Sequence, residues 1–263
     1  MRLGFIGCGN MAEAIMGGVI KNNFLNPEDI IGSDIAEAGR DRVKQDYGIR
    51  VTESNLEVAE NSDILILAVK PQFYQSVIEE IRDAVEKQLI ITIAPGKTLN
   101  WLEEQFGKPV KIFRAMPNTA ALVLEGMTAA CMNKYVTEEE KDYACHLLGC
   151  FGEVEIVPER LFDAVVAVSG SSPAYVFMMI EAMADAAVSE GMPRLQAYKF
   201  AAQAVMGSAK MVLDLKQHPG ELKDMVCSPG GTTIEAVRVL EERGFRGALI
   251  EAMKVCADVS RSL

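Results

Sequence analysis

Histidine and basic side chains are scarce in this 263-residue chain. It has 2 His, and its 26 Lys and Arg are outnumbered by 37 Asp and Glu, which gives a net charge of −11. Because His146 and His218 stand in different contexts, a histidine-rich metal site or a Ser-His-Asp triad is hard to assemble, and we expect no bound metal. The acidic balance repels phosphate backbones and anionic lipid headgroups, so neither nucleic acid nor a membrane is an expected partner.

Disulfide motifs and long uncharged apolar runs are also missing. The 6 cysteines form no C-x-x-C pair, and most lie in apolar periodic segments, which predicts reduced, buried thiols in a cytoplasmic protein. The most apolar segment, residues 174–188, carries Glu181 and Asp185, so we expect it to be too short and too acidic to span a bilayer and to form a buried helix. No signal peptide is expected, because Met1 and Arg2 lead directly into a strand-like run.

Apolar sequence is abundant, and in the first half of the chain it alternates between strand-like and helical runs. This alternation is typical of a doubly wound α/β fold with a parallel sheet covered on both faces, as in Rossmann-type domains. The expected strands are residues 3–6, 30–33, 64–69, 89–93, 111–114 and 128–132. The expected helices among them are residues 11–21, 73–85, 99–106 and 137–150.

The pattern changes near Pro158, after which almost no strand-like sequence remains. We expect helices at residues 174–190, 195–215, 220–226, 234–242 and 246–260. The chain therefore divides into a predicted Rossmann domain, residues 1–159, and a predicted all-helical domain, residues 160–263. Helices this rich in Met and Ala would leave large apolar patches exposed, so we expect a second copy of the chain to cover them.

A glycine-rich turn follows the first expected strand. Gly7-Cys8-Gly9-Asn10-Met11-Ala12 fits G-x-G-x-x-G/A and leads into a helix. Gly7 permits the tight turn, Gly9 lets a pyrophosphate approach the backbone, and the helix N-terminus stabilises the phosphate charge. Because the turn opens a βαβ pattern, a dinucleotide site outweighs a chance glycine turn. The expected contacts are Ile6, Gly7, Cys8, Gly9, Asn10 and Met11.

Asp34 ends the second expected strand, where the ribose 2′ group of a dinucleotide lies. A carboxylate accepts a hydrogen bond from a 2′-hydroxyl and repels a 2′-phosphate, which favours NADH. Ser33, Arg40 and Arg42 are near enough to bind a phosphate, so NADPH stays the alternative. A second interpretation of Asp34 is a helix N-cap.

The carboxyl ends of the next strands supply the remaining expected cofactor contacts, because ligands of parallel α/β sheets bind at that edge. These contacts are Ala68, Val69, Lys70, Pro71, Ala94 and Pro95, and residues 116–119 are expected to face the same crevice. Lys70 has a solvated loop lysine as its other interpretation. Asn55 is expected at the adenosine side, with a helix cap as its other interpretation.

A second glycine-rich turn, Ser228-Pro229-Gly230-Gly231-Thr232-Thr233, precedes an amphipathic run. Its glycines let the backbone approach a ligand, and the free N–H groups and dipole of the following helix suit a small anion such as a carboxylate. Thr232 or Thr233 is expected to cap that helix, and the hydroxyls can bond a reacting atom. A plain helix-capping turn is the competing interpretation.

Several blocks together resemble the pyrroline-5-carboxylate reductase family over essentially the whole chain. They are F-I-G-C-G-N-M at 5–11, A-V-K-P at 68–71, R-A-M-P-N-T at 114–119, S-G-S-S-P-A-Y at 169–175 and H-P-G-E-L-K-D-M-V-C-S-P-G-G-T-T at 218–233. The resemblance implies NAD(P)H-dependent reduction of L-1-pyrroline-5-carboxylate to L-proline, the last step of proline synthesis. It also implies a Rossmann domain, a helical dimerisation domain, and homodimers that assemble further, sometimes into decamers.

The same resemblance implies roles for single residues. Thr233 would hydrogen-bond the ring nitrogen as the catalytic residue, and the backbone of residues 228–232 would hold the carboxylate. Since a protonated cyclic imine accepts hydride readily, the task is mainly one of positioning. Thr233 would first of all orient the nitrogen, with relay of a proton as its alternative role. Many relatives have a hydroxyl residue in place of Asp34. The implied substrate contacts are Glu159, Ser228, Gly230, Gly231, Thr232 and Thr233, with a surface residue at the domain boundary as the other interpretation of Glu159.

Two other functions fit parts of the sequence. A related imine or β-hydroxyacid reductase would share the architecture, and the hydroxyacid enzymes use a lysine on a second-domain helix. Lys199 and Lys210 are on such helices, but their sequence surroundings do not match. A non-enzymatic nucleotide-binding regulator would keep the first glycine turn but has no need for the second.

Overall fold

The computed structural model describes residues 1–262, which form two compact units. The first unit runs from Met1 to Ser171 and includes the chain from Cys256 onward, and the second is Ser172–Val255. The chain passes from the first unit to the second after Ser171 and returns after Val255, and both positions lie in the helical part of the sequence. The expected domain division after residue 159 stays a prediction, because compactness alone does not define a folding domain.

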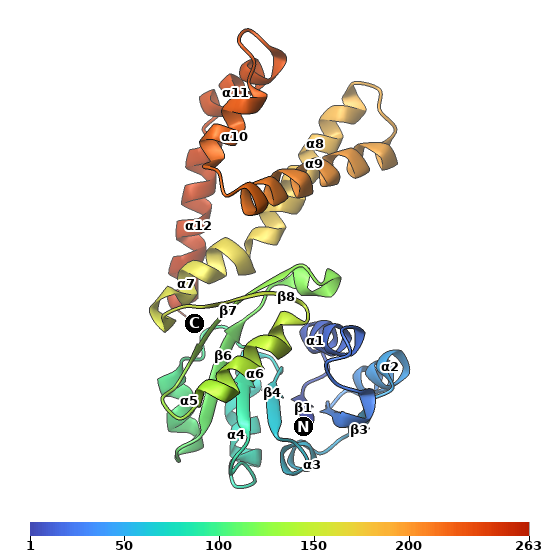
Figure 1. Ribbon diagram of the computed structural model, residues 1–263, viewed down its shortest axis with the longest axis vertical. Coiled ribbons are helices and arrows are strands. Elements are labelled where there is room, and N and C mark those ends of the chain that lie inside the picture. Colours follow the sequence, from blue (N-terminus) through green and yellow to red (C-terminus); the bar gives the residue numbers. More distant parts are fainter. Residues whose placement is uncertain (263) are drawn as a thin grey trace. The chain divides into compact units, whose positions relative to one another are not determined.

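An eight-stranded sheet in the order β3-β2-β1-β4-β5-β6-β7-β8 forms the first unit (Figure 1). The strands are β1 (Leu3–Ile6), β2 (Ile30–Ser33), β3 (Arg50–Thr52), β4 (Ile64–Leu67), β5 (Leu89–Thr92), β6 (Lys111–Met116), β7 (Gly126–Met132) and β8 (Gly152–Ile156). All neighbouring strands are parallel except β6 and β7. The strand order reverses between β1 and β4, which is where open α/β sheets bind ligands.

Helices cover both faces of this sheet, because alternate strand side chains point to opposite faces. Leu3 and Phe5 belong to one buried cluster, with residues of α1 (Asn10–Lys21), α2 (Glu37–Tyr47) and α6 (Glu138–Gly149). Ile6 belongs to the other cluster, with residues of α3 (Asn55–Glu60), α4 (Tyr74–Ile81) and α5 (Leu99–Phe106). The predicted doubly wound Rossmann-type fold is confirmed.

Short turns of helix join these elements. They are the 3-10 turns η1 (Pro27–Asp29), η2 (Pro71–Phe73), η3 (Thr119–Val123) and η4 (Glu159–Leu161), then α7 (Phe162–Val165) and the π-helical turn η5 (Val166–Gly170). All six cysteines are free thiols, but only Cys8 and Cys131 are buried. The expected burial of the cysteines therefore holds for two of them.

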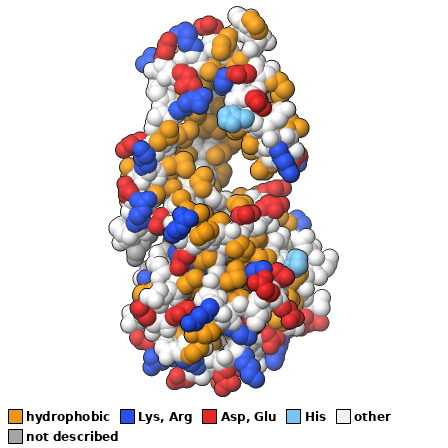
Figure 2. Space-filling model, turned by 60° about the vertical axis from the view of Figure 1, so that its left-hand side comes forward, with side chains coloured by type: hydrophobic (Ala, Val, Ile, Leu, Met, Phe, Trp, Pro, Cys, Tyr) orange, Lys and Arg blue, Asp and Glu red, His pale blue; other side chains and the backbone are white. Residues whose placement is uncertain are grey.

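The second unit is entirely helical, as expected. It contains α8 (Ser172–Ser189), α9 (Arg194–Leu215), α10 (Pro219–Val226), α11 (Thr232–Glu242) and most of α12 (Phe245–Arg261). Helices α8 and α9 pack against each other, yet Phe177, Met178 and Phe200 are 65%, 69% and 66% exposed. Figure 2 shows apolar side chains gathered on the surface of the helical unit. Only Ala184 of α8 is buried, so the expectation of a buried helix over residues 174–188 is wrong for a single copy of the chain.

Two strands and the direction of a third were not predicted. β3 is three residues long, and β8 has the sequence Gly-Glu-Val-Glu-Ile with exposed charges, so neither forms an apolar run. Strands β6 and β7 are antiparallel because only the short η3 segment joins them, whereas a parallel pair needs a longer crossover. Helix α2 was missed because its sequence is polar and it buries only Val43.

One helical stretch, Glu159–Ser189, is long and apolar enough to cross a membrane by length and composition alone. From the sequence, residues 174–188 were expected to be too short to span a bilayer, because the helical turns before Ser172 were not expected. Only 17% of its most apolar window is buried within the chain. An apolar face that a partner subunit covers passes the same test, so the criterion by itself does not distinguish lipid from protein contact.

Candidate active site

Gly7 directly follows β1 and contacts the carboxyl ends of β2 and β4. Its φ of 98° lies in the region that favours glycine, and its N–H donates to the Ser33 carbonyl at 2.8 Å. A Cβ at this position would stand 2.8 Å from the carbonyl carbon and oxygen of Ala68. Gly7 is therefore required both by the backbone turn and by the close approach of the β4 end.

Gly9 leaves an open cradle at the start of α1. It is the N-cap, in an extended conformation, and no atom lies within 4 Å of the place where a Cβ would stand. Because glycine has no side chain to cap the helix, the first N–H groups of α1 are available to a ligand. An open backbone face at a helix N-terminus fits the pyrophosphate of a dinucleotide.

The Asp34 carboxylate fastens this loop to the end of β2. Its Oδ2 accepts the Cys8 N–H and its Oδ1 accepts the Ala36 N–H, both at 2.8 Å. Helix α2 begins at Glu37 with Ala36 as its N-cap, so the helix-cap interpretation of Asp34 is wrong. The structure brings Asp34 to the glycine loop, while its contact with a ribose stays a prediction.

The Cys8 side chain is a neutral packing group inside the loop. Burial, followed by the charges of Asp34 and Glu13, raises the pKa of its thiol to about 12. The thiol therefore stays protonated at neutral pH and contributes no charge beside the phosphate cradle. Its backbone N–H is already taken by Asp34, which leaves Gly9 and the residues after it to face a phosphate.

Asn55 contacts Ser33, the last residue of β2. The Ser33 hydroxyl donates to its Oδ1 at 2.7 Å, and its Nδ2 donates to Glu80 at 2.7 Å. The cap of α3 is Ser54, whose Oγ accepts the Glu57 N–H at 3.1 Å, so the helix-cap interpretation of Asn55 is wrong. A role at the adenosine side stays a prediction.

The loops after β4 and β5 reach the same edge. The Ala68 N–H donates to the Ile6 carbonyl at 2.8 Å, and Val69 is half-buried beside it. Lys70 is exposed and precedes η2, in which Pro71 is the first residue. Ala94 and Pro95 follow β5, which pairs with β4 through Leu67 and Thr92. The cofactor residues expected in the first unit thus gather at one edge of the sheet.

Asn118 makes a link that sequence reasoning missed. Its Nδ2 donates to the Ser169 hydroxyl at 3.2 Å and carbonyl at 3.3 Å, while its Oδ1 accepts the Met127 N–H at 3.1 Å. The link joins the loop after β6 to the π-helical turn η5. The only sequence sign of it was that the two residues belong to motif blocks R-A-M-P-N-T and S-G-S-S-P-A-Y.

Glu159 is engaged within the first unit. Its Oε1 accepts Arg114 Nη1 and the Leu99 N–H, each at 2.7 Å. The Arg114 side chain is 6% exposed and its guanidinium carbon lies 4.3 Å from the Phe162 ring centre. These contacts tie η4 to β6 and α5, and the expected contact of Glu159 with substrate stays a prediction.

The second glycine turn lies in the second unit. The Gly231 N–H donates to the Ser228 carbonyl at 3.0 Å, and Gly230 has a φ of 67°, which together with Pro229 describes a type II turn. Gly231 is the N-cap of α11, and Thr232 and Thr233 are its first two residues. The expectation that a threonine caps this helix is therefore wrong. Because glycine caps it, the first N–H groups of α11 are available to an anion.

Known proteins resemble the chain from end to end. The sequence pattern described as pyrroline-5-carboxylate reductase dimerisation matches residues 159–263. A relative from Escherichia coli (strain K12) named pyrroline-5-carboxylate reductase is 54% identical, over 100% of this chain and 98% of its own length. The chain belongs to the pyrroline-5-carboxylate reductase family. A pattern described as NADP oxidoreductase, coenzyme F420-dependent, matches residues 2–96, the part that contains the first glycine turn.

Solved structures of this family have the same fold. A pyrroline-5-carboxylate reductase from Coxiella burnetii, 35% identical, has a TM-score of 0.92 over 99% of this chain and 97% of its own. The Plasmodium falciparum pyrroline carboxylate reductase with NADP bound, 32% identical, has a TM-score of 0.91 over 100% of this chain and 97% of its own. The hydroxyacid-reductase alternative is not favoured: Lys199 is exposed, and Lys210 pairs with Asp214 at 2.8 Å.

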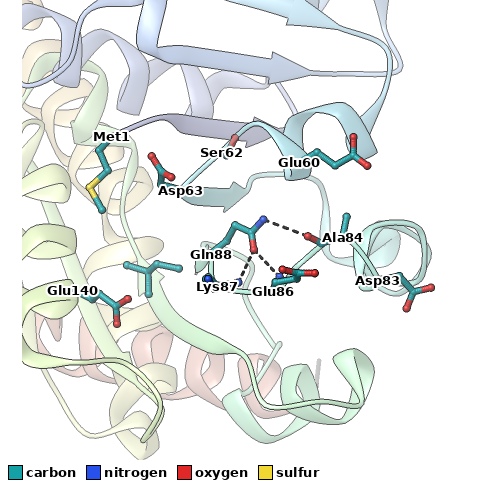
Figure 3. Close-up of a pocket in the computed structure, with 11 residues that line it drawn as sticks. Met1, Glu60, Ser62, Asp63, Asp83, Ala84, Glu86, Lys87, Gln88 and Glu140 are labelled. Atoms are coloured by element: carbon teal, nitrogen blue, oxygen red, sulfur yellow. Dashed lines mark hydrogen bonds between the residues drawn. The ribbon is translucent and has the colours of Figure 1, made fainter.

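A cavity of about 670 Å³ opens elsewhere on the first unit (Figure 3). Its lining includes Met1, Asp63 and Leu89, which stand at the amino ends of β1, β4 and β5. Gln88 in its wall accepts the N–H groups of Glu86 and Lys87, at 2.7 and 2.9 Å. Since ligands of such sheets bind at the carboxyl ends of strands, this cavity is not the active site.

Proposed function

We propose that this chain reduces L-1-pyrroline-5-carboxylate to L-proline with a reduced nicotinamide dinucleotide, the last step of proline synthesis. The observation that carries this function is full-length similarity to pyrroline-5-carboxylate reductases at up to 54% identity among those compared. Both glycine turns that such a reaction needs are present in that length. The chain is thus an oxidoreductase that acts on a cyclic imine.

The first unit holds the dinucleotide in this proposal. Gly7 shapes the turn, the backbone from Gly9 to Met11 meets the pyrophosphate at the start of α1, and Ala68 to Pro71 and Ala94 to Pro95 line the crevice. The reduced cofactor supplies the hydride. The protein's task is to hold the cofactor and the substrate in the geometry of hydride transfer. Such positioning removes a large share of the activation barrier.

The second glycine turn holds the substrate in this proposal. The N–H groups at the start of α11, with those of Ser228 to Gly231, bind the carboxylate, and the α11 dipole adds positive potential there. Thr233 sits one residue inside the helix, where its hydroxyl orients the ring nitrogen. A threonine hydroxyl is a poor acid near neutral pH, so orientation is its main role. Glu159 is proposed as a further substrate contact.

The cofactor is a nicotinamide dinucleotide, and we propose NADH as the preferred form. Asp34 supports this choice, because a carboxylate at the end of β2 accepts from a 2′-hydroxyl and repels a 2′-phosphate. The NADP-bound relative from Plasmodium falciparum supports the alternative. Changing Asp34 to Ser is expected to shift preference toward NADPH by about tenfold. An unaltered ratio of the NADH and NADPH affinities would remove Asp34 from the ribose site.

The chain forms homo-oligomers, and the helical unit supports a dimer as the smallest one. We propose that a second copy, and no lipid, covers the exposed apolar side chains of α8, and that dimers assemble further, for example into a decamer. We also propose a cytoplasmic protein that binds neither membranes nor nucleic acid. The acidic net charge of −11 and the six free thiols support this location.

An assay with two substrates tests the function. The purified chain receives pyrroline-5-carboxylate or a 3-hydroxy acid, with the matching form of each nicotinamide cofactor, and turnover is followed by absorbance and by proline analysis. We expect turnover of the imine and none of the hydroxy acid. Turnover of the hydroxy acid alone would replace this function with that of a hydroxyacid dehydrogenase.

A further inference from the structure

Two arginines stand beside Asp34, and each is already paired with a glutamate. Arg40 pairs with Glu53 at 2.5 Å, and Arg42 pairs with Glu13. Arginine near this position is the residue type that accommodates the 2′-phosphate of NADPH. The pairing therefore determines whether these two cations are available to such a phosphate.

Arg40 is fixed at both ends of its guanidinium group. Its Nη1 donates to the Asp34 carbonyl at 2.7 Å and its Nη2 donates to Glu53 Oε1 at 2.5 Å. The Arg40 side chain is 11% exposed, whereas that of Glu53 is 81% exposed. A largely enclosed cation is thus paired with a carboxylate that is mostly exposed to water, and this ion pair links Glu53 to the site.

Arg42 is held in a similar way from the other side. Its Nε donates to Glu13 Oε1 at 2.5 Å, and its Nη2 donates to the Cys8 carbonyl at 3.4 Å. Glu13 lies in the first turn of α1, directly after the phosphate cradle, and its side chain is 17% exposed. This pair joins α2 to the glycine loop.

The charges of this cluster leave an excess of one negative charge. Asp34, Glu13 and Glu53 contribute three carboxylates against the two guanidinium groups of Arg40 and Arg42. A phosphate monoester carries about −1.5 to −2 charges at neutral pH, so the cluster repels it, whereas a hydroxyl is unaffected.

We infer that Glu53 and Glu13 are specificity-determining residues, which hold Arg40 and Arg42 away from the cofactor 2′ position and so disfavour a 2′-phosphate. Asp34 is then one of three carboxylates that set the preference. This inference rests on the proposed function, because it concerns the cofactor of that reaction. It removes the phosphate-binding role that the sequence left open for the two arginines in the unmodified chain.

Direct binding measurements on the full chain test the inference. Dissociation constants for NADH and NADPH are measured by titration of cofactor fluorescence for wild type, Glu53→Gln, Glu13→Gln and the double variant. Each single variant is expected to tighten NADPH binding about fivefold and the double variant more, while NADH binding changes less than about twofold. Higher salt is expected to weaken NADPH binding more steeply in the double variant than in wild type, because a new charge pair forms.

Glu138→Gln is the matched control. Glu138 is 86% exposed and pairs with Lys141 in α6, so the variant removes the same charge and one surface ion pair outside the cluster. Its ratio of NADPH to NADH affinity is expected to equal that of wild type. An equal gain in this control would mean that only net charge matters, and the inference would be overturned.

The outcomes separate this inference from the proposed function. A lower thermal midpoint in Glu13→Gln would mean that this variant is destabilised. The test then uses only the exposed Glu53, with Glu53→Ala as a second variant. An unchanged affinity ratio in Glu53→Gln and Glu53→Ala overturns the inference even where wild type reduces the imine normally. Failure of wild type to reduce the imine would instead overturn the function, and cofactor binding would still be measured.

Discussion

Gly7 and Gly9 stand two residues apart in one loop and are required for different reasons. Gly7 has a φ of 98° and lies against the Ala68 backbone, whereas Gly9 has a φ of −83°, which any residue adopts, and faces open space. The fold requires the first glycine, whereas the second leaves room where we propose that the cofactor binds. The sequence motif predicted a turn at Gly7 and a close ligand approach at Gly9, and the structure shows a constrained backbone at the first and open space at the second.

This difference predicts opposite results for two alanine variants. Gly7→Ala is expected to lower the free energy of unfolding by about 2–4 kcal/mol, because a Cβ at positive φ would overlap the Ala68 carbonyl. Gly9→Ala is expected to leave the thermal midpoint of the cofactor-free chain unchanged and to weaken cofactor binding by about tenfold or more. Thermal unfolding and cofactor titration measure the two effects. Equal destabilisation by both variants would contradict the assignment.

Thr233 carries the second prediction at this scale. Thr233→Ala is expected to lower kcat/KM about 10- to 100-fold, the loss of one hydrogen bond to a charged group, and to change the cofactor dissociation constant less than about twofold. Thr233→Ser keeps the hydroxyl and is expected to recover most of the activity. Full activity in the alanine variant would reduce Thr233 to an ordinary helix residue.

Helix α6 illustrates how an element is fixed at its start. Thr137 Oγ1 accepts the Glu140 N–H at 3.2 Å, and Glu140 Oε2 accepts the Thr137 N–H at 3.0 Å, which forms a capping box. Glu140 also accepts from Lys111 of β6 at 2.5 Å. Thr137→Ala is expected to lower the free energy of unfolding by about 1 kcal/mol, measured by urea denaturation. No loss would mean that the helix start is held by packing alone.

The same element predicts a pH dependence. Burial opposes the charge on Glu140, but hydrogen bonds from Lys111 and Thr137 outweigh it and hold the pKa of this carboxyl below its ordinary value of 4.5. A lowered folded-state pKa stabilises the fold fully above the ordinary value and loses that stabilisation as pH falls through the folded one. The difference in stability between wild type and Glu140→Gln is therefore expected to be constant above pH 4.5 and to shrink below it. A difference that grows on acidification would reverse the sign and contradict the contact.

Apolar periodicity predicted the elements that have it. Helix α5 was expected at its observed bounds. In the structure it buries Leu102 and Phe106, which are four residues apart, and Thr98 caps its start. Strands β3 and β8 were not predicted because pairing with a neighbouring strand, rather than their own sequence, makes them strands. The gathering of the expected cofactor residues at one edge of the sheet was predictable from the glycine motif and the strand ends. The glutamate partners of Arg40 and Arg42 depend on tertiary contacts that no local pattern encodes.

At the scale of the whole molecule, the helices expose apolar side chains that we expect a second copy of the chain to cover. Phe177, Ile180 and Tyr198 line a groove between α8 and α9, and Phe177 is 65% exposed. Phe177→Asp places a charge where a partner subunit is expected, so it is expected to yield a monomer with greatly reduced turnover. Sedimentation measures the mass, and Phe73→Asp, an exposed phenylalanine of the first unit, is the control that keeps it. An unchanged mass in Phe177→Asp would place the interface elsewhere.

The proposed reaction transfers a hydride from the nicotinamide to the imine carbon, and an isotope label follows that transfer. The chain is given pyrroline-5-carboxylate and a reduced nicotinamide cofactor with deuterium at both C4 positions, and the proline formed is analysed by mass spectrometry and NMR. We expect one deuterium per proline, at the former C=N carbon, for each cofactor oxidised. Cofactor oxidation without proline, or proline whose deuterium is absent or elsewhere, would contradict it.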